Sequence, residues 1–231
     1  MPYFNIVAET SENTVVTEYE PVKKRSDSYQ SEAQLEQEFI RLLCEQGYEY
    51  LPIHTEKDLI GNLRKKLEEL NNYQFSDTEW DDFFKNAVAN PNEHIVEKTR
   101  KIQEDNVQVL TRDDGSSKNI TLIDKKNIHN NRLQVINQYV IGTENGAKHD
   151  NRYDVTVLVN GLPLVHIELK RRGVAIREAF NQINRYQRDS FWAGCGLYEY
   201  IQIFVISNGT NTKYYSNSTR RNAVSYTHLR A

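Results

Sequence analysis

Residues 154–170 form the stretch DVTVLVNGLPLVHIELK, in which apolar side chains recur at every second position on both sides of Asn160-Gly161. Alternation of this kind predicts β-strands, and Asn-Gly is a frequent turn between two paired strands. The stretch therefore predicts a β-hairpin with strands over residues 152–159 and 162–170.

The register of this hairpin follows from the face that its valines bury. A strict two-residue turn would set valines against the charged face. A three-residue connection with a bulge at Gly161 instead pairs Val157 with Val165 and Val155 with Ile167. We expect this second register, because strand register is set by which face is buried.

Three charged side chains converge in that register. Asp154 lies opposite Glu168, and Lys170 follows two residues later on the same face. Two carboxylates and the carbonyl of Leu169 are oxygen ligands for a hard cation such as Mg²⁺. An ammonium can orient a water or offset charge on a phosphate. The alternative is an ion-pair cluster on a solvated sheet face, but the apolar strand around Glu168 favours a site for phosphodiester hydrolysis.

The rest of the chain predicts an α/β domain around this hairpin. Apolar residues at helical spacing predict a helix over residues 31–46 that ends at Gly47. Three polar helical stretches, which we expect in an outer layer or insertion and not in the core, cover residues 56–71, 77–89 and 92–104. The remaining predicted elements are strands at 48–51, 106–110, 119–123, 133–141, 200–207 and 212–215 and a helix at 174–192.

The helix after the charged strand carries Gln182 and Tyr186 on one face, because residues four apart are neighbours on a helix. Such a pair can reach a nucleotide or position the lysine. The alternative is a satisfied amide beside a half-buried tyrosine.

The order and spacing of these residues resemble the PD-(D/E)xK nuclease core. The Gln182-x-x-x-Tyr186 motif that follows this core is similar to one in the R subunits of type I restriction–modification systems and in some helicase-linked nucleases. The resemblance covers roughly residues 28–216 and departs from the motif name at Tyr153, which stands where the name has proline. The matching positions are Asp154, then thirteen residues, then Glu168-Leu169-Lys170, and later Gln182-x-x-x-Tyr186.

The resemblance implies an α/β fold of the restriction-endonuclease-like class, with a mixed central sheet flanked by helices and a helical insertion at 56–104. It implies that Asp154 and Glu168 bind Mg²⁺ and that Lys170 completes the catalytic set. The opening helix would add an acidic ligand, for which Glu36 is our candidate and Glu32, one turn earlier, the alternative.

The resemblance also makes Gln182 and Tyr186 an auxiliary motif. The nearby cationic residues that we expect to bind DNA phosphates are Arg171, Arg172 and Arg185. The alternative for these arginines is a solvated helix face.

The implied function is that of the N-terminal endonuclease domain of a type I site-specific deoxyribonuclease in the cytoplasm. The same subunit would translocate double-stranded DNA with ATP, and methylation (M) and specificity (S) subunits would supply target recognition. Residues 142–149 lack the spacing of an ATP-binding loop, so we expect ATP use only through motor domains absent from this chain. The alternatives are a stand-alone or helicase-fused repair nuclease and a catalytically silent interaction domain.

Composition gives no support to a DNA-binding role, although a nucleic-acid-binding protein need not be basic overall. The chain has 231 residues and a formal net charge of −3, so any basic surface must be local. It has no apolar run long enough to span a membrane. Its histidines and two cysteines lack zinc-site spacing. We expect an arm at 1–27, the endonuclease domain at 28–216 and a truncated or non-native tail at 217–231.

Overall fold

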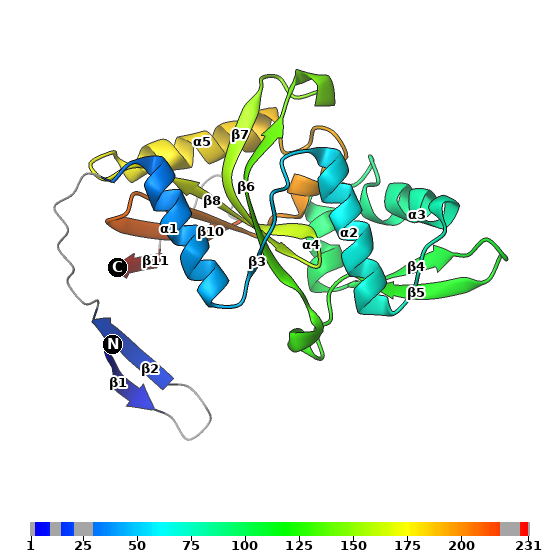
Figure 1. The fold of residues 1–231 in the computed structure, drawn as a ribbon, viewed down its shortest axis with the longest axis horizontal. Helices are drawn as coiled ribbons and strands as arrows, with labels where there is room; N and C mark the ends of the chain where they lie inside the picture. Colours follow the sequence, from blue (N-terminus) through cyan, green and yellow to red (C-terminus); the bar gives the residue numbers. More distant parts are fainter. Residues whose placement is uncertain (1–2, 10–14, 21–29, 218–226, 231) are drawn as a thin grey trace.

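A seven-stranded mixed sheet forms the centre of the chain, in the order β11-β10-β9-β8-β7-β6-β3 (Figure 1). The computed structural model describes residues 3–9, 15–20, 30–217 and 227–230. Within the sheet, β8 and β9 are parallel, as are β3 and β6, and the other neighbouring strands are antiparallel. The strands are β3 (Glu49–Tyr50), β6 (Leu133–Ile141), β7 (Asn151–Val159), β8 (Leu162–Leu169), β9 (Ile203–Ser207), β10 (Asn211–Ser216) and β11 (Thr227–Arg230). The predicted mixed sheet is therefore confirmed.

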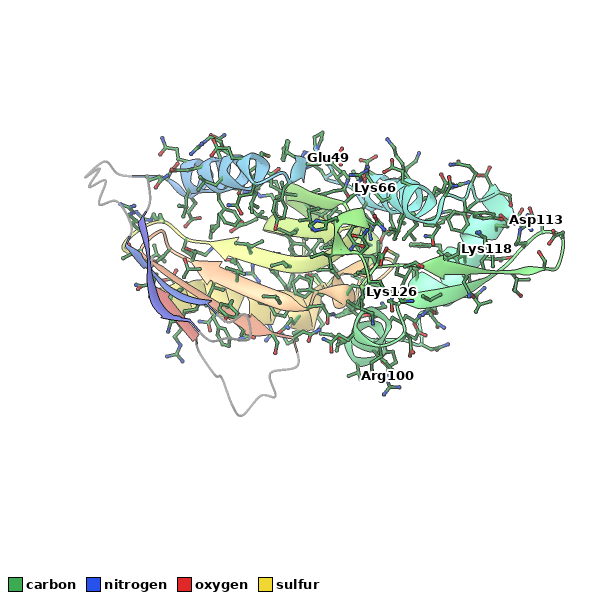
Figure 2. All side chains as sticks on the ribbon, turned by 90° about the horizontal axis from the view of Figure 1, so that it is seen from below. Glu49, Lys66, Arg100, Asp113, Lys118 and Lys126 are labelled. Carbon is green, nitrogen blue, oxygen red and sulfur yellow. The ribbon has the colours of Figure 1, made fainter. Side chains whose placement is uncertain are left out.

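Two smaller sheets are hairpins that pair only with themselves. The first consists of β1 (Tyr3–Glu9) and β2 (Val15–Glu20), within the predicted arm. The second consists of β4 (Val107–Thr111) and β5 (Ser117–Thr121), close to its predicted position. Figure 2 shows Asp113 and Lys118 at the outer end of this second hairpin, far from α1 (Glu32–Glu45).

The helices occur where periodicity predicts them. They are α1, α2 (Glu56–Asn71), α3 (Asp77–Phe83) with a π-helical turn η1 (Phe84–Val88), α4 (Ile95–Gln103) and α5 (Ile176–Asp189), with short 3-10 turns at η2 (Ile128–Asn130), η3 (Thr143–Asn145) and η4 (Leu197–Tyr200). Ser31 caps α1 by accepting a hydrogen bond from the N–H of Gln34, whose side chain in turn accepts from the N–H of Ser31. Gly47 follows the end of this helix with a φ of +93°, as a glycine after a helix often does.

The sheet separates two apolar cores. On one side, Leu35, Phe39 and Leu43 of α1 pack against a small buried cluster of sheet residues. On the other side, α5 and η4 contribute to a much larger aromatic and aliphatic cluster. The sheet residues of the small cluster are Val135, Val155, Val157, Ile167 and Leu169. Because these valines do bury one face together, the hydrophobic argument for the hairpin register rests on a real core.

The prediction that residues 56–104 lie outside the core is wrong. Leu59, Leu63 and Leu67 on α2 are fully buried, and they belong to the same cluster as Leu158 and Leu162 of the main sheet. The reason is amphipathicity: a narrow apolar stripe fills the core, while the many exposed polar residues of the same helix dominate its composition.

The central hairpin has the predicted pairing but a different irregularity. Val157 pairs with Val165, and Val155 pairs with Ile167, as expected. The bulge is not at Gly161, however: Val159 pairs with Leu162 across a tight two-residue turn, and the extra residue is Leu164. Asn160 and Gly161 have φ values of +52° and +85°, which is the backbone of a tight turn that matches strand twist. The turn thus has two residues, and the one-residue shift in register is made within β8, at Leu164.

We predict that Gly161→Ala destabilises the fold by roughly 2–4 kcal/mol. A Cβ at this position would lie 2.6 Å from the Cα of Leu63 in α2, so backbone would have to move. Gly115→Ala is the matched control, because Gly115 has a similar φ of +80° but nothing near its Cβ position. Urea unfolding of both variants measures the difference. Equal losses of stability would mean that the contact with α2 contributes nothing beyond the backbone conformation.

Candidate active site

The candidate site lies where β7 and β8 stop pairing. The last backbone pair between these two strands is Val155 with Ile167. Beyond this pair the strands separate, and the Asp154 carboxylate lies in the opening between them. Asp154 Oδ2 accepts a hydrogen bond of 2.9 Å from the N–H of Leu169. Asp154 therefore sits directly beside Glu168, as the predicted register requires.

Glu168 and Lys170 form a close pair within this opening. The Lys170 ammonium donates to Glu168 Oε1 at 3.0 Å and to the carbonyl oxygen of Leu169 at 3.1 Å. Glu168 is fully buried, and its other oxygen, Oε2, has no hydrogen-bond partner. An unpartnered buried carboxylate oxygen costs free energy, so its presence beside a second carboxylate suggests that a cation belongs there.

Burial raises the pKa of both carboxyl groups, and their charged neighbours modify the two shifts differently. Burial raises the pKa of Asp154 to about 7, and the nearby Glu168 charge adds to this rise. Burial also raises the pKa of Glu168, although Lys170 opposes the effect. Burial lowers the pKa of Lys170, but attraction to Glu168 more than offsets this, and the net pKa is raised. Lys170 is thus a stable cation beside two acids that are destabilised as anions.

The donor set fits a divalent cation that keeps several waters. Among the described residues, no three histidine, cysteine or acidic side chains group closely enough to form a metal site by themselves. Mg²⁺ in proteins is commonly held by one or two carboxylates with water filling the remaining positions. Asp154, Glu168 and the carbonyl of Leu169 are ligands of this kind.

The structure separates the two acidic candidates on α1. Glu36 is buried, and its carboxylate accepts hydrogen bonds from the side chains of Asn137 and Gln138 on β6. Burial raises the pKa of Glu36, and the Asp154 charge contributes to the rise. Glu32 instead accepts from the N–H of Arg171, at 3.2 Å. Glu36 is therefore the one directed toward Asp154, with both carboxylate oxygens engaged by amides.

Gln138, which donates a hydrogen bond to Glu36 from β6, is a further residue at the site that the sequence did not predict. Gln138 lies opposite Asp154, between the backbone pairs Asn137–Val155 and Tyr139–Tyr153. Its φ is +53°. This conformation costs a non-glycine residue on the order of 1–3 kcal/mol, and such strain is often found at functional sites. No local sequence signal distinguishes Gln138 from an ordinary strand residue.

The auxiliary pair braces the strand that carries Asp154. Tyr186 is almost fully buried, and its hydroxyl donates to the carbonyl of Arg152 at 2.9 Å. Gln182 Nε2 donates to the same hydroxyl, which confirms that the two side chains share a face. The burial of Tyr186 favours a bracing role over contact with a nucleotide.

The three arginines are exposed, and Arg185 lies beside Lys170 at the candidate site. Arg185 and Gln182 join Lys170 in lining a shallow depression of about 360 Å³. The Arg185 guanidinium also lies over the Tyr186 ring, 5.3 Å from its centroid. Arg171 and Arg172 directly follow Lys170. Two cationic side chains, Lys170 and Arg185, therefore line the depression that we assign to the buried carboxylates, together with the acidic Glu178.

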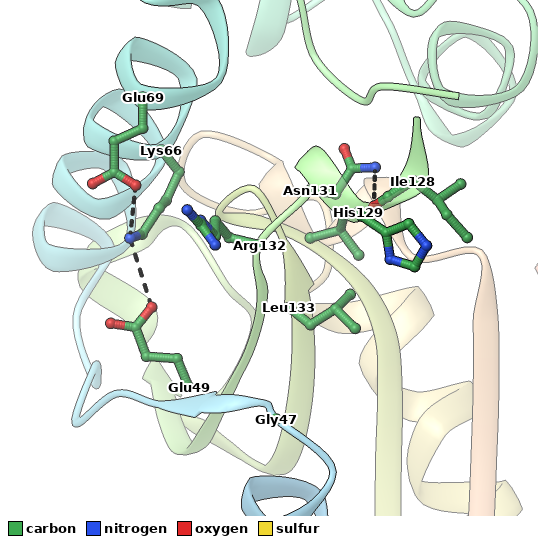
Figure 3. A pocket seen from close by; sticks show the side chains of 10 residues that line it. Gly47, Glu49, Lys66, Glu69, Ile128, His129, Asn131, Arg132 and Leu133 are labelled. Carbon is green, nitrogen blue, oxygen red and sulfur yellow. Dashed lines mark hydrogen bonds and ion pairs between the residues drawn. The ribbon is translucent and has the colours of Figure 1, made fainter. Parts of the chain in front are cut away.

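A more spacious cavity, of about 800 Å³, lies elsewhere (Figure 3). Val159, at the turn end of β7, lines it, whereas Asp154 is near the start of that strand. Its Lys66 ammonium is 3.0 Å from Glu69 and 3.6 Å from Glu49, so these charges satisfy one another. Size alone therefore does not identify the site.

The pH dependence of stability should reveal the paired carboxylates. A carboxyl whose pKa is raised on folding stabilises the fold below its unfolded pKa and loses that contribution as the pH rises through the folded pKa. Without divalent cations, the wild type should therefore lose stability relative to Asp154→Asn between about pH 4 and about pH 7. Thermal unfolding of both proteins in EDTA across this range measures the difference. A constant difference would contradict a raised pKa for Asp154.

Comparison with known proteins gives a consistent set of relatives. A family model described as the type I restriction enzyme R protein N terminus matches residues 29–223. The type I restriction enzyme EcoprrI endonuclease subunit of Escherichia coli is 49% identical over 95% of this chain and 69% of its own length. The SsaAORF53P endonuclease subunit of Staphylococcus saprophyticus is 40% identical over 82% of this chain but only 20% of its own length. The HindI endonuclease subunit of Haemophilus influenzae is 31% identical, over 78% of this chain and 18% of its own length.

Proposed function

Because this chain belongs to the type I restriction enzyme R proteins and is the N-terminal region of such an endonuclease subunit, we propose that it is the subunit's DNA-cleaving domain. Its fold would be that of the PD-(D/E)xK nucleases, and its reaction the hydrolysis of DNA phosphodiester bonds. The observation that carries the proposal is the convergence of Asp154, Glu168 and Lys170 at one opening in the sheet.

Asp154, Glu168 and the carbonyl of Leu169 would hold Mg²⁺, and Glu36 is the further acidic candidate from α1. When bound, this ion would polarise the phosphodiester and lower the pKa of a water. The fit rests on the unpartnered oxygen of Glu168 and on the raised pKa values of both carboxyl groups, which a cation would relieve.

Lys170 would act on the scissile phosphate. Its ammonium is only slightly exposed, so its charge is weakly screened and can stabilise the negative charge that grows on a phosphate. Tyr186 and Gln182 would keep the start of β7 in place through the carbonyl of Arg152. Arg171, Arg172 and Arg185 would bind DNA phosphates without reading sequence.

The remaining features belong to the whole subunit. The chain spans about two thirds of the E. coli relative but only about a fifth of the staphylococcal ones. We propose that the intact subunit translocates double-stranded DNA with ATP through domains outside this chain, and that it assembles with M and S subunits in the cytoplasm. Among the described residues, no helix is long and apolar enough to cross a membrane. Residues 28–216 would form the nuclease domain.

A chimeric subunit tests the proposal. The aligned region of the longer SsaAORF53P endonuclease subunit of Staphylococcus saprophyticus is replaced by this chain, which the 40% identity makes practicable. With its partner subunits and ATP, the chimera should cut unmodified plasmid DNA in the presence of Mg²⁺. A chimera that assembles and hydrolyses ATP like the native subunit but leaves DNA uncut would overturn the proposal and favour a silent interaction domain.

A further inference from the structure

His166 is buried in the core beside the candidate site without any conventional hydrogen bond. It is fully inaccessible, and neither Nδ1 nor Nε2 has a partner. The rings of Tyr153, Tyr186 and Phe191 surround it, with centroids 5.4, 6.0 and 5.6 Å away. Burying a polar ring without a hydrogen bond among these aromatic side chains costs free energy, whereas burying an apolar ring of the same size does not. Packing alone therefore does not explain a histidine at this position.

The imidazole has a polar neighbour in the candidate site. His166 Nε2 is 3.5 Å from Glu168 Oε2, which is itself the unpartnered carboxylate oxygen of the candidate site. The other oxygen of that carboxylate already accepts a hydrogen bond from Lys170 at 3.0 Å. Two adjacent buried groups that each lack a partner can satisfy one another after a small adjustment of either side chain.

We propose that His166 is a positioning residue that donates its Nε2–H to Glu168 Oε2 and so fixes the plane of this carboxylate. His166 then engages the Glu168 oxygen that Lys170 does not contact, and the carboxylate presents its remaining lone pairs to a cation. The inference rests on the proposed function, because that function puts a cation at Asp154 and Glu168.

The chemistry of imidazole fixes the tautomer. A neutral imidazole has one donor and one acceptor nitrogen, and a carboxylate only accepts. The contact with Glu168 is therefore favourable only when Nε2 carries the proton and Nδ1 faces the apolar cage. Partners of this type orient ligating carboxylates, and their removal weakens metal binding by about 10–100-fold.

Substitution separates positioning from packing. His166→Phe keeps an aromatic ring but removes the donor, whereas His166→Gln can place an amide N–H near the position of Nε2. Calorimetric titration of the 231-residue chain with Mn²⁺ should show at least about tenfold weaker binding for the Phe variant and partial recovery for the Gln variant.

The matched control is Tyr198→Phe. Tyr198 belongs to the same aromatic cluster, and its hydroxyl contacts Thr156 at 3.3 Å, not an acidic residue. This control should bind Mn²⁺ like the wild type. A folded His166→Phe protein that also binds Mn²⁺ like the wild type overturns the proposal for His166 while leaving the proposed function intact.

Nitrogen NMR of the wild-type imidazole gives a second test that needs neither a variant nor a bound metal. At pH 7, His166 should be the neutral tautomer protonated at Nε2. A proton on Nδ1 instead overturns the proposal, whatever the variants do. If the wild type binds no Mn²⁺ and yet shows the expected tautomer, the proposed metal site fails and the hydrogen bond to Glu168 stands.

Discussion

Asparagine in place of Asp154 should lower DNA cleavage by about a thousandfold or more while leaving the fold intact. A metal ligand contributes several kcal/mol to stabilising a phosphoryl transition state, and each 1.4 kcal/mol is about tenfold in rate. The amide oxygen of asparagine can still accept the hydrogen bond that the N–H of Leu169 donates to Asp154. The substitution therefore removes the charge without removing the contact that closes the end of the hairpin.

Glu168→Gln should have an effect of the same size for the same reason. Both variants are measured in the chimeric subunit, where plasmid cleavage and ATP hydrolysis can be followed together. ATP hydrolysis should stay at the wild-type rate, because neither residue belongs to a nucleotide site. Asp81→Asn is the control, since Asp81 is exposed on α3 and lies in no proposed site. Cleavage at the wild-type rate by both Asp154→Asn and Glu168→Gln would remove these residues from the active site.

The sequence could predict this site because the apolar pattern determines the position of the charges. Val155 and Ile167 must pair if the valine face is to be buried against α1, and that pairing places Asp154 beside Glu168. The bulge itself could not be located from the pattern, because a tight turn followed by a bulge at Leu164 gives the same pairing as a wider turn. Burial of the valine face therefore determines which residues pair near the site. The position of the bulge depends on the backbone conformation of the turn, which the apolar pattern does not reveal.

Long-range packing accounts for what the sequence did not predict. Gln138 has a left-handed backbone, and its side chain donates a hydrogen bond to Glu36, which is far away in the sequence. From spacing, Glu36 was the candidate and Glu32 the alternative, and the docking of α1 on β6 shows which of them contacts the strand beside Asp154. The core role of α2 was hidden for a similar reason, because its buried leucines meet partners from distant strands.

Methionine in place of Lys170 should separate metal binding from catalysis. We expect cleavage to fall by about a hundredfold to a thousandfold, because a charged donor aimed at the phosphate is lost. The affinity for Mn²⁺ should be unchanged or a few-fold tighter. The Lys170 ammonium now lies on Glu168 Oε1 and on the carbonyl oxygen of Leu169, which are two of the oxygens that we assign to the metal. A divalent cation must therefore bind against the repulsion of this charge.

Calorimetry with Mn²⁺ at pH 8, which limits protonation of the carboxylates, is compared with plasmid cleavage for the same variants. Lys57→Met, at an exposed position of α2, controls for the loss of one positive charge. Glu168→Gln should lose both metal affinity and cleavage, whereas Lys170→Met should lose cleavage alone. If Lys170→Met loses both, then Lys170 acts by holding Glu168 in place, because only a ligand displaced from its position would weaken binding and catalysis together.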